Sequence, residues 1–118
     1  MGVRFAKNER IISKKTADII YKSGKRRYSN SFVIIWGKHA DEPIVKVLIV
    51  VPKKNIKRAV DRNYTKRIIR ECYIQNKKLI YDVVPHPLAI ILIYNKSTLP
   101  KFDKLNSELL TLFKSWGK

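Results

Sequence analysis

Residues 44–76 read IVKVLIVVPKKNIKRAVDRNYTKRIIRECYIQN, and this stretch decides the fold. Its first part, Ile44 to Val51, is apolar at almost every position, which predicts a strand with both faces covered. After Pro52, the segment from about Ile56 to Asn76 contains no glycine or proline, which predicts a helix roughly 30 Å long at ~1.5 Å per residue. A strand followed by a long helix requires a sheet on which the helix can pack.

The flanking sequence supplies the partners of that strand and helix. Upstream, a short helix is predicted between its N-cap Ser13 and Gly24, which would end the helix in a left-handed conformation. Residues 28–36 alternate bulky and smaller side chains, which predicts a strand. Downstream we expect a third strand, Leu88 to Tyr94, and an amphipathic helix from Phe102 to Trp116. The order helix, strand, strand, long helix, strand, helix predicts an α+β fold, with a small sheet packed with helices.

Composition favours one domain in a reducing compartment. The chain has 118 residues, 45 % of them hydrophobic, and no linker divides it, so we expect a single domain over residues 1–118. The lone cysteine, Cys72, cannot form an internal disulfide and is expected to be a small buried hydrophobe in a cytoplasmic protein. Residues 1–10 lack a signal-peptide core and no apolar run has membrane-spanning length, so we expect no membrane partner.

The positive charge is concentrated in two segments. The net charge of +17 comes from 26 lysines and arginines against 9 aspartates and glutamates. Residues 1–27 carry 9 basic and 2 acidic side chains and residues 53–78 carry 10 and 2, so these segments hold +15 of the total. Such charge is self-repulsive without a polyanion, and its clustering is typical of a nucleic-acid-binding protein.

The cations of the long helix can be placed because successive residues are separated by about 100°. One grouping contains Arg58, Arg62, Lys66 and Arg70, and a second contains Asn63, Lys66, Arg67 and Arg70; the sequence does not choose between them. Like charges at i, i+4 repel by roughly 0.2–0.5 kcal/mol for each pair, which RNA phosphates would offset. A solvated helix face is the alternative. We therefore predict RNA binding by Arg58, Arg62, Asn63, Lys66, Arg67 and Arg70.

The stretch AVDRNYTKRIIRE, Ala59 to Glu71, resembles the signature of the protein subunit of bacterial-type ribonuclease P. That signature has an Arg-Asn-Arg core followed by Lys-Arg and an Arg-Glu or Arg-Gln pair. The lead-in VPKKNIKRAV, residues 51–60, and the segment FAKNERI, residues 5–11, also resemble this family. The similarity covers about residues 5–113. The positions in register with the signature are Arg62, Asn63, Lys66, Arg67, Arg70 and Glu71.

The resemblance implies a fold and two RNA-binding surfaces. It implies a split βαβ arrangement like that of a ribosomal-protein domain, with a left-handed crossover that general sheet rules would not predict. It also implies that the arginine-rich helix binds the catalytic RNA, while a cleft between sheet and first helix holds the single-stranded leader of precursor tRNA. An extended strand suits aromatic or apolar platforms beside cations. The candidates for this cleft are Tyr21, Phe32, Ile35, Lys53 and Lys54, with ordinary core packing as the alternative for Phe32 and Ile35.

Catalysis, by the same resemblance, would belong to the RNA. The protein would assist endonucleolytic removal of the leader in tRNA maturation, and Mg²⁺ would accompany the RNA partner. We expect no catalytic residue, metal site or cofactor in this chain, and no small-molecule substrate. His39 and His86 lie in segments that would not position a general base, and the acids are scattered, so the chain does not resemble a nuclease by itself.

Three positions depart from the family pattern. Tyr64 replaces the second arginine of the core, Pro52 replaces a serine, and Ala17 replaces a common phenylalanine. A ribosomal or ribosome-associated RNA-binding protein without a processing role is the alternative function, and the helix signature argues against it. A membrane-surface protein is disfavoured, because the amphipathic last helix has only two lysines, Lys104 and Lys114, on its polar side.

Overall fold

The described structure is a four-stranded sheet with helices on both sides. The computed structural model describes residues 14–38, 45–83 and 88–115. β4 (Leu88–Tyr94) pairs antiparallel with β2 (Phe32–Gly37) and parallel with β3 (Val45–Val50), and β1 (Lys25–Tyr28) pairs antiparallel with β2. The strand order is β1-β2-β4-β3, so the strongly apolar β4 lies inside the sheet.

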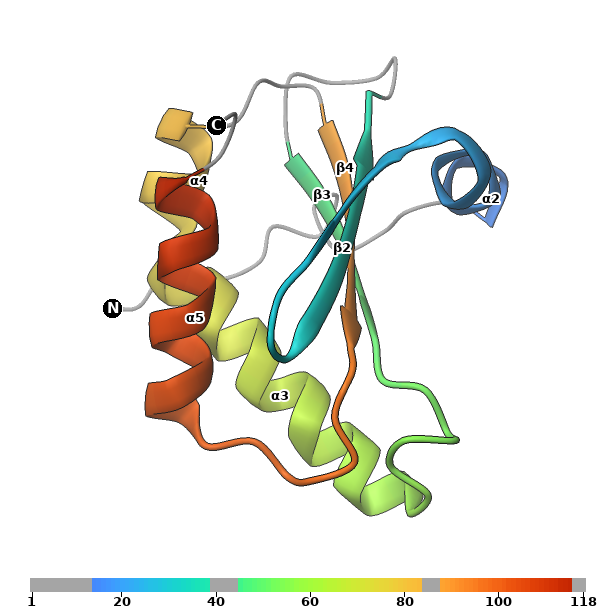
Figure 1. Cartoon of the computed structure of the whole chain (residues 1–118), viewed down its shortest axis with the longest axis vertical. Helices are drawn as coiled ribbons and strands as arrows, with labels where there is room; N and C mark the ends of the chain where they lie inside the picture. The colour runs from blue at the N-terminus through green and yellow to red at the C-terminus, as the bar shows by residue number, and fades with distance from the viewer. Residues whose placement is uncertain (1–13, 39–44, 84–87, 116–118) are drawn as a thin grey trace.

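The helices cover the two faces of this sheet unequally. α3 (Ala59–Gln75), α4 (Lys77–Val83) and α5 (Phe102–Lys114) lie on one side, and of the described helices only α2 (Lys14–Ser23) lies on the other (Figure 1). The larger core fills the side with three helices. Its fully buried side chains include Phe32, Ile34, Ile69, Tyr73, Ile90, Leu92, Leu109 and Phe113.

α2 docks on its face of the sheet mainly through Ile20, with Ala17 packed partly buried beside it. Ile20 is buried with Ile35, Ala89 and Ile91 in a second, smaller core. A Cβ atom at Gly37 would lie only 3.4 Å from Cγ1 of Ile20, so the helix sits over the end of β2. Full burial of an isoleucine contributes roughly 1.5–3 kcal/mol, which is enough to hold so short a helix in place.

Most predicted elements are present, with shifted boundaries. The strand predicted over residues 28–36 is divided by a turn in which the amide of Ser29 donates to the carbonyl of Phe32 at 2.8 Å. β1 was not predicted, because its sequence KRRY lacks the apolar alternation of a strand. It is an edge strand, so its side chains can be polar. α3 begins at Ala59, three residues later than expected, because the carbonyl of Pro52 accepts from the amides of Asn55 and Ile56 at 3.0 and 3.1 Å in a preceding turn.

The predicted α+β fold class is confirmed, and two details expected of the strands differ. β3 and β4 are direct neighbours joined through α3 and α4, so no strand splits the βαβ unit. The strand predicted to have both faces covered is open on the side of α2, where Leu48 and Val50 are only half-buried, because α2 does not extend across them. The predicted N-cap Ser13 and the apolar Trp116 lie outside the described residues.

Cys72 is a fully buried thiol, as predicted. Burial raises the pKa of Cys72 to about 12, and the negative charge of Glu71 acts in the same direction. Because the thiolate is the reactive species, this cysteine is inert at neutral pH and serves the packing of α3.

Gly24 ends α2, although not in the predicted left-handed conformation, since its φ lies outside that region. Its amide donates to the carbonyl of Ile20 at 2.7 Å. A Cβ atom here would lie 2.5 Å from the carbonyl oxygen of Ile20 and 2.7 Å from that of Trp36. Glycine is therefore required by the close approach of the helix end to β2.

We predict that Gly24→Ala lowers the free energy of unfolding by about 1–3 kcal/mol, because the added methyl group must push two backbone segments apart. Urea unfolding followed by circular dichroism measures the change. Ser23→Ala, at the exposed neighbouring position, is the control and should change stability by less than about 0.5 kcal/mol. A Gly24→Ala protein as stable as the parent would show that α2 does not need this contact.

Candidate nucleic-acid interface

α3 presents a polar outer side and an apolar inner side. Its buried residues are Thr65, Ile69, Cys72 and Tyr73. Just beyond its end, the side-chain amide of Asn76 donates to the side-chain oxygen of Asn106 on α5 at 2.8 Å. The inner side is thereby fixed against α5. The exposed residues of its central turns are Val60, Asn63, Tyr64, Arg67 and Glu71.

This orientation separates the two cation groupings that the sequence left open. Asn63 and Arg67 are exposed on the outer side, and Lys66 and Arg70 are half-buried on the adjoining flank. At about 100° per residue these four positions fall within one continuous arc of the helix. The second predicted grouping, Asn63, Lys66, Arg67 and Arg70, thus lies on the outer side of α3 and its adjoining flank, and we call these four residues the outer arc.

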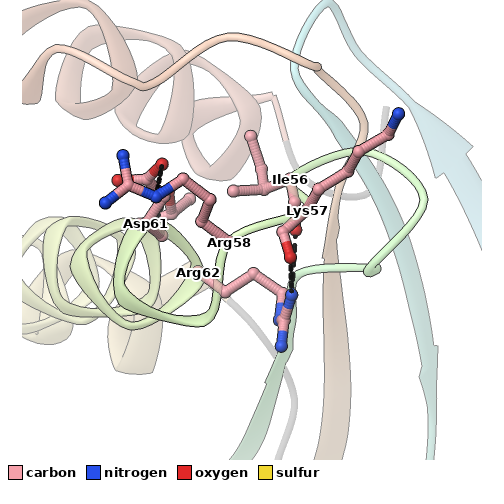
Figure 2. Close-up of polar contacts among 6 residues, drawn as sticks. Ile56, Lys57, Arg58, Asp61 and Arg62 are labelled. Carbon is pink, nitrogen blue, oxygen red and sulfur yellow. Dashed lines mark hydrogen bonds and ion pairs between the residues drawn. The ribbon is translucent and has the colours of Figure 1, made fainter.

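The other two predicted cations contact the protein itself (Figure 2). Nη1 of Arg62 donates to the carbonyls of Ile56 and Lys57 at 3.1 and 2.8 Å, which ties the helix to the turn before it. Nε of Arg58 lies 3.9 Å from a carboxylate oxygen of Asp61, with 76 % of the Arg58 side chain exposed. So exposed a pair contributes little, whereas the two bonds of Arg62 anchor the start of α3. Arg62 is thus engaged by the protein's own backbone, whereas Arg58 stays largely exposed.

A second surface lies on the side of the sheet that carries α2. Residues paired across a sheet share a face, and the registers place Val33 beside Ile93 and Ile93 beside Val50. All three are half-buried, and together with Leu48 they continue the apolar face beyond the cover of α2. We call Val33, Leu48, Val50 and Ile93 the open strip.

Aromatic and cationic side chains border the open strip along β1. Tyr28 pairs with Val33 and is 69 % exposed. Arg26 shares the same face; it donates to the carbonyl of Tyr21 at 2.6 Å, and its guanidinium lies 5.5 Å from the centre of the Tyr21 ring. The Tyr21 ring, itself 45 % exposed, is therefore held in position at the edge of α2.

The predicted cleft residues divide into accessible and inaccessible ones. Tyr21, Lys53 and Lys54 are exposed, and the two lysines lie in the turn that follows β3. Phe32 and Ile35 are both fully buried, Phe32 in the three-helix core and Ile35 beneath α2, so their assignment to an RNA-contacting surface is wrong. Side chains at positions 32 and 35 point to opposite faces, and both faces are packed at those points.

The open strip, Arg26 and Tyr28 were missed by the sequence analysis. For the open strip the sequence does contain a signal. Lys46 interrupts the otherwise apolar β3, and because side chains alternate along a strand, it indicates that the face shared by Lys46, Leu48 and Val50 is partly exposed. No such signal marked Arg26 and Tyr28, whose side of β1 depends on the pairing with β2.

A family model described as "Ribonuclease P" matches residues 5–117. The chain belongs to the ribonuclease P family. A relative from Pseudoalteromonas atlantica, named "Ribonuclease P protein component", is 30 % identical over an alignment that covers 97 % of this chain and 88 % of the relative. The solved ribonuclease P protein of Thermotoga maritima is 27 % identical with a TM-score of 0.76, covering 93 % of this chain and 99 % of that one. The Staphylococcus aureus ribonuclease P protein is 26 % identical with a TM-score of 0.75, covering 92 % and 94 %.

The departures from the ribonuclease P pattern have structural counterparts. Tyr64 is 41 % exposed beside the outer arc, so its ring is available to a ligand. Pro52 provides the carbonyl that organises the turn before α3. Ala17 is half-buried against the core beneath α2, where it fills less space than the phenylalanine common in the family.

Two further properties concern metals and membranes. Within residues 14–38, 45–83 and 88–115, no group of three or more His, Cys, Asp or Glu side chains is arranged to hold a metal ion. None of the helices in those ranges is long and apolar enough to cross a membrane. His39 and His86 lie outside the described residues.

The contacts of α3 predict that its arginines affect stability differently. Arg62→Ala should lower the free energy of unfolding by about 1 kcal/mol, because two hydrogen bonds from a half-buried cation to the preceding turn are lost. Arg67→Ala removes an exposed side chain and should change it by less than about 0.5 kcal/mol. Equilibrium urea unfolding distinguishes them, and equal losses would contradict the anchoring role of Arg62.

Proposed function

We propose that this chain is the protein subunit of ribonuclease P, with the outer arc of α3 binding the catalytic RNA and the open strip binding the leader of precursor tRNA. The cleavage chemistry belongs to the RNA and its Mg²⁺, and the protein positions the leader. The site of action is the cytoplasm. Family membership argues against the alternative of a ribosomal protein without a processing role.

The observation that carries this proposal is the pairing of two unlike surfaces on one rigid fold. The outer arc offers cations and an amide, which suit the phosphates and sugars of a folded RNA. The open strip offers apolar side chains with Tyr21 and Tyr28 at one border, which suit the unstacked bases of a single strand. A protein that binds one RNA needs only one of these surfaces. A subunit that contacts both a folded RNA and a single-stranded leader needs both.

Reconstitution tests the proposed function directly. Adding the chain to a bacterial ribonuclease P RNA and precursor tRNA at low Mg²⁺ should stimulate removal of the leader, measured by gel electrophoresis of the cleaved RNA. If six to ten phosphates are contacted, affinity for the catalytic RNA should fall roughly 10³- to 10⁵-fold between 50 and 200 mM salt. Absence of stimulation together with a flat salt response would contradict the proposal.

Two substitutions should separate the two surfaces. Tyr21→Ala should weaken binding of precursor tRNA to the reconstituted enzyme by about 1–3 kcal/mol, the usual cost of one lost aromatic stack, while leaving mature tRNA binding unchanged. Arg67→Ala should weaken binding of the protein to the catalytic RNA. Lys78→Ala, which removes an exposed cation from α4, is the control for charge alone.

Fluorescence titrations with labelled RNA measure all three variants. If Tyr21→Ala impaired precursor and mature tRNA alike, the open strip would not be the leader site. If Lys78→Ala weakened catalytic-RNA binding as much as Arg67→Ala, overall charge rather than the outer arc would determine affinity.

A further inference from the structure

The loop of residues 95–101, between β4 and α5, is fastened at the end of the molecule where α3 and α5 begin (Figure 1). The hydroxyl of Tyr94 donates to the carbonyl of Thr98 at 2.7 Å, and the amide of Asn95 donates to the carbonyl of Ser31 at 2.7 Å. The side-chain amide of Asn55, from the turn before α3, donates to the carbonyl of Tyr94 at 3.0 Å. This loop therefore holds a defined shape between the starts of the two helices.

Two hollows flank the loop and share one residue, Leu99, which is 50 % exposed. The hollow of about 490 Å³ lies against the start of α3, and the hollow of about 400 Å³ lies against the start of α5. The first is lined by Lys54, Lys57 and Arg58, and the second by Lys96, Lys101 and Lys104. We call these six cations and Leu99 the basic end.

The acids at this end are fewer than the cations and are partly engaged. One carboxylate oxygen of Glu108 accepts hydrogen bonds from the hydroxyl of Ser29 and the amide of Ser31. Asp61 faces Arg58, and Asp103 is an exposed acid in the first turn of α5. Within the described ranges, Lys96, Lys101 and Lys104 form no ion pair. The basic end thus keeps an excess of positive charge.

The positions of two of these cations are unfavourable in the isolated protein. Arg58 and Lys101 occupy the N-cap positions of α3 and α5, and neither makes a side-chain capping bond. Helix N-termini carry a partial positive charge, so a cation there is repelled where an anion would be stabilised. A bound polyanion spanning both hollows would offset this repulsion at two helices together.

We propose that the basic end binds the phosphodiester backbone of RNA, extending the contacts of the open strip and of α3 around the loop of residues 95–101. The inference rests on the proposed function. Lys54 lines the first hollow and lies in the turn that follows β3, whose last residue, Val50, belongs to the open strip, so this turn connects the two surfaces along the chain. An extended chain with repeating charge fits better than a small anion, because two cation clusters are separated by an apolar side chain that a ribose or base can cover. The phosphates could belong to the leader or to the catalytic RNA.

A matched pair of double variants tests the basic end. Lys101→Gln/Lys104→Gln removes two exposed charges from it, and Lys78→Gln/Lys114→Gln removes two exposed charges from α4 and the far end of α5. Both variants should stay folded in thermal unfolding, with Lys101→Gln/Lys104→Gln at least as stable as the parent because a cation is lost from a helix N-terminus, and Lys78→Gln/Lys114→Gln slightly less stable because a cation is lost from the last turn of α5. Affinity is measured across a salt series for bacterial ribonuclease P RNA alone, and for precursor tRNA with short and long leaders on the reconstituted enzyme.

The expected result is a decrease of about 2 in the log–log salt slope for Lys101→Gln/Lys104→Gln, about 1 for each lost phosphate contact, with no decrease for the control pair. A decrease with the catalytic RNA alone assigns the contact to that RNA, and a decrease confined to long leaders assigns it to the leader. If the log–log salt slopes of the two variants were equal for every RNA, the proposed RNA binding by the basic end would be wrong. The proposed function would still hold if the parent chain stimulated cleavage normally. Failure of the parent chain to bind either RNA would overturn both.

Discussion

A sheet in water must cover its apolar faces, and the unequal cover of the two faces of this sheet leaves one of them available for the proposed RNA contact. On one side α3, α4 and α5 cover the larger core, and only Trp36 and Ile49 of the described strand side chains packed against it are partly exposed. On the other, α2 is short and is anchored by Ile20 at one end of β2 and β4, so Val33, Ile93 and Val50 stay half-buried. A longer α2 would stabilise the protein further and would remove the open strip. The exposed apolar surface is therefore the part of the fold on which the proposed leader binding depends.

The same packing assigns different roles to neighbouring arginines of one motif. Thr65, Ile69 and Cys72 fix which side of α3 faces the core, and the helical repeat then directs Arg67 outward. Arg62, five residues earlier, is directed toward the backbone of the turn that precedes the helix. The family signature thus combines residues that build the helix start with residues that are available to a ligand.

The sequence predicted the elements better than it predicted their exposed surfaces. The apolar spacing from Phe102 to Phe113 and the isoleucine-rich strand from Leu88 to Tyr94 are properties of single segments, and both predictions are confirmed. Burial of Phe32 and Ile35 depends on which helices reach which half of the sheet, which local pattern does not contain. The choice between the two cation groupings likewise required the contact of α3 with α5. The sequence does not predict a site at Lys96, Lys101 and Lys104, because these lysines do not form a cluster along the chain. The loop after β4 brings them to the same end of the molecule as Lys54 and Arg58.

Hydrogen bonds hold the turn between β3 and α3 at two points. The side-chain amide of Asn55 donates to the carbonyl of Tyr94, the last residue of β4, and the guanidinium of Arg62 donates to the carbonyls of Ile56 and Lys57. These hydrogen bonds hold β3, which carries Leu48 and Val50 of the open strip, in a fixed position relative to α3, which carries the outer arc. In the proposed subunit, the outer arc and the open strip are therefore held at a fixed distance from each other. In the proposed complex, the adjustment that brings different leaders to one cleavage position would come from the RNA strands themselves.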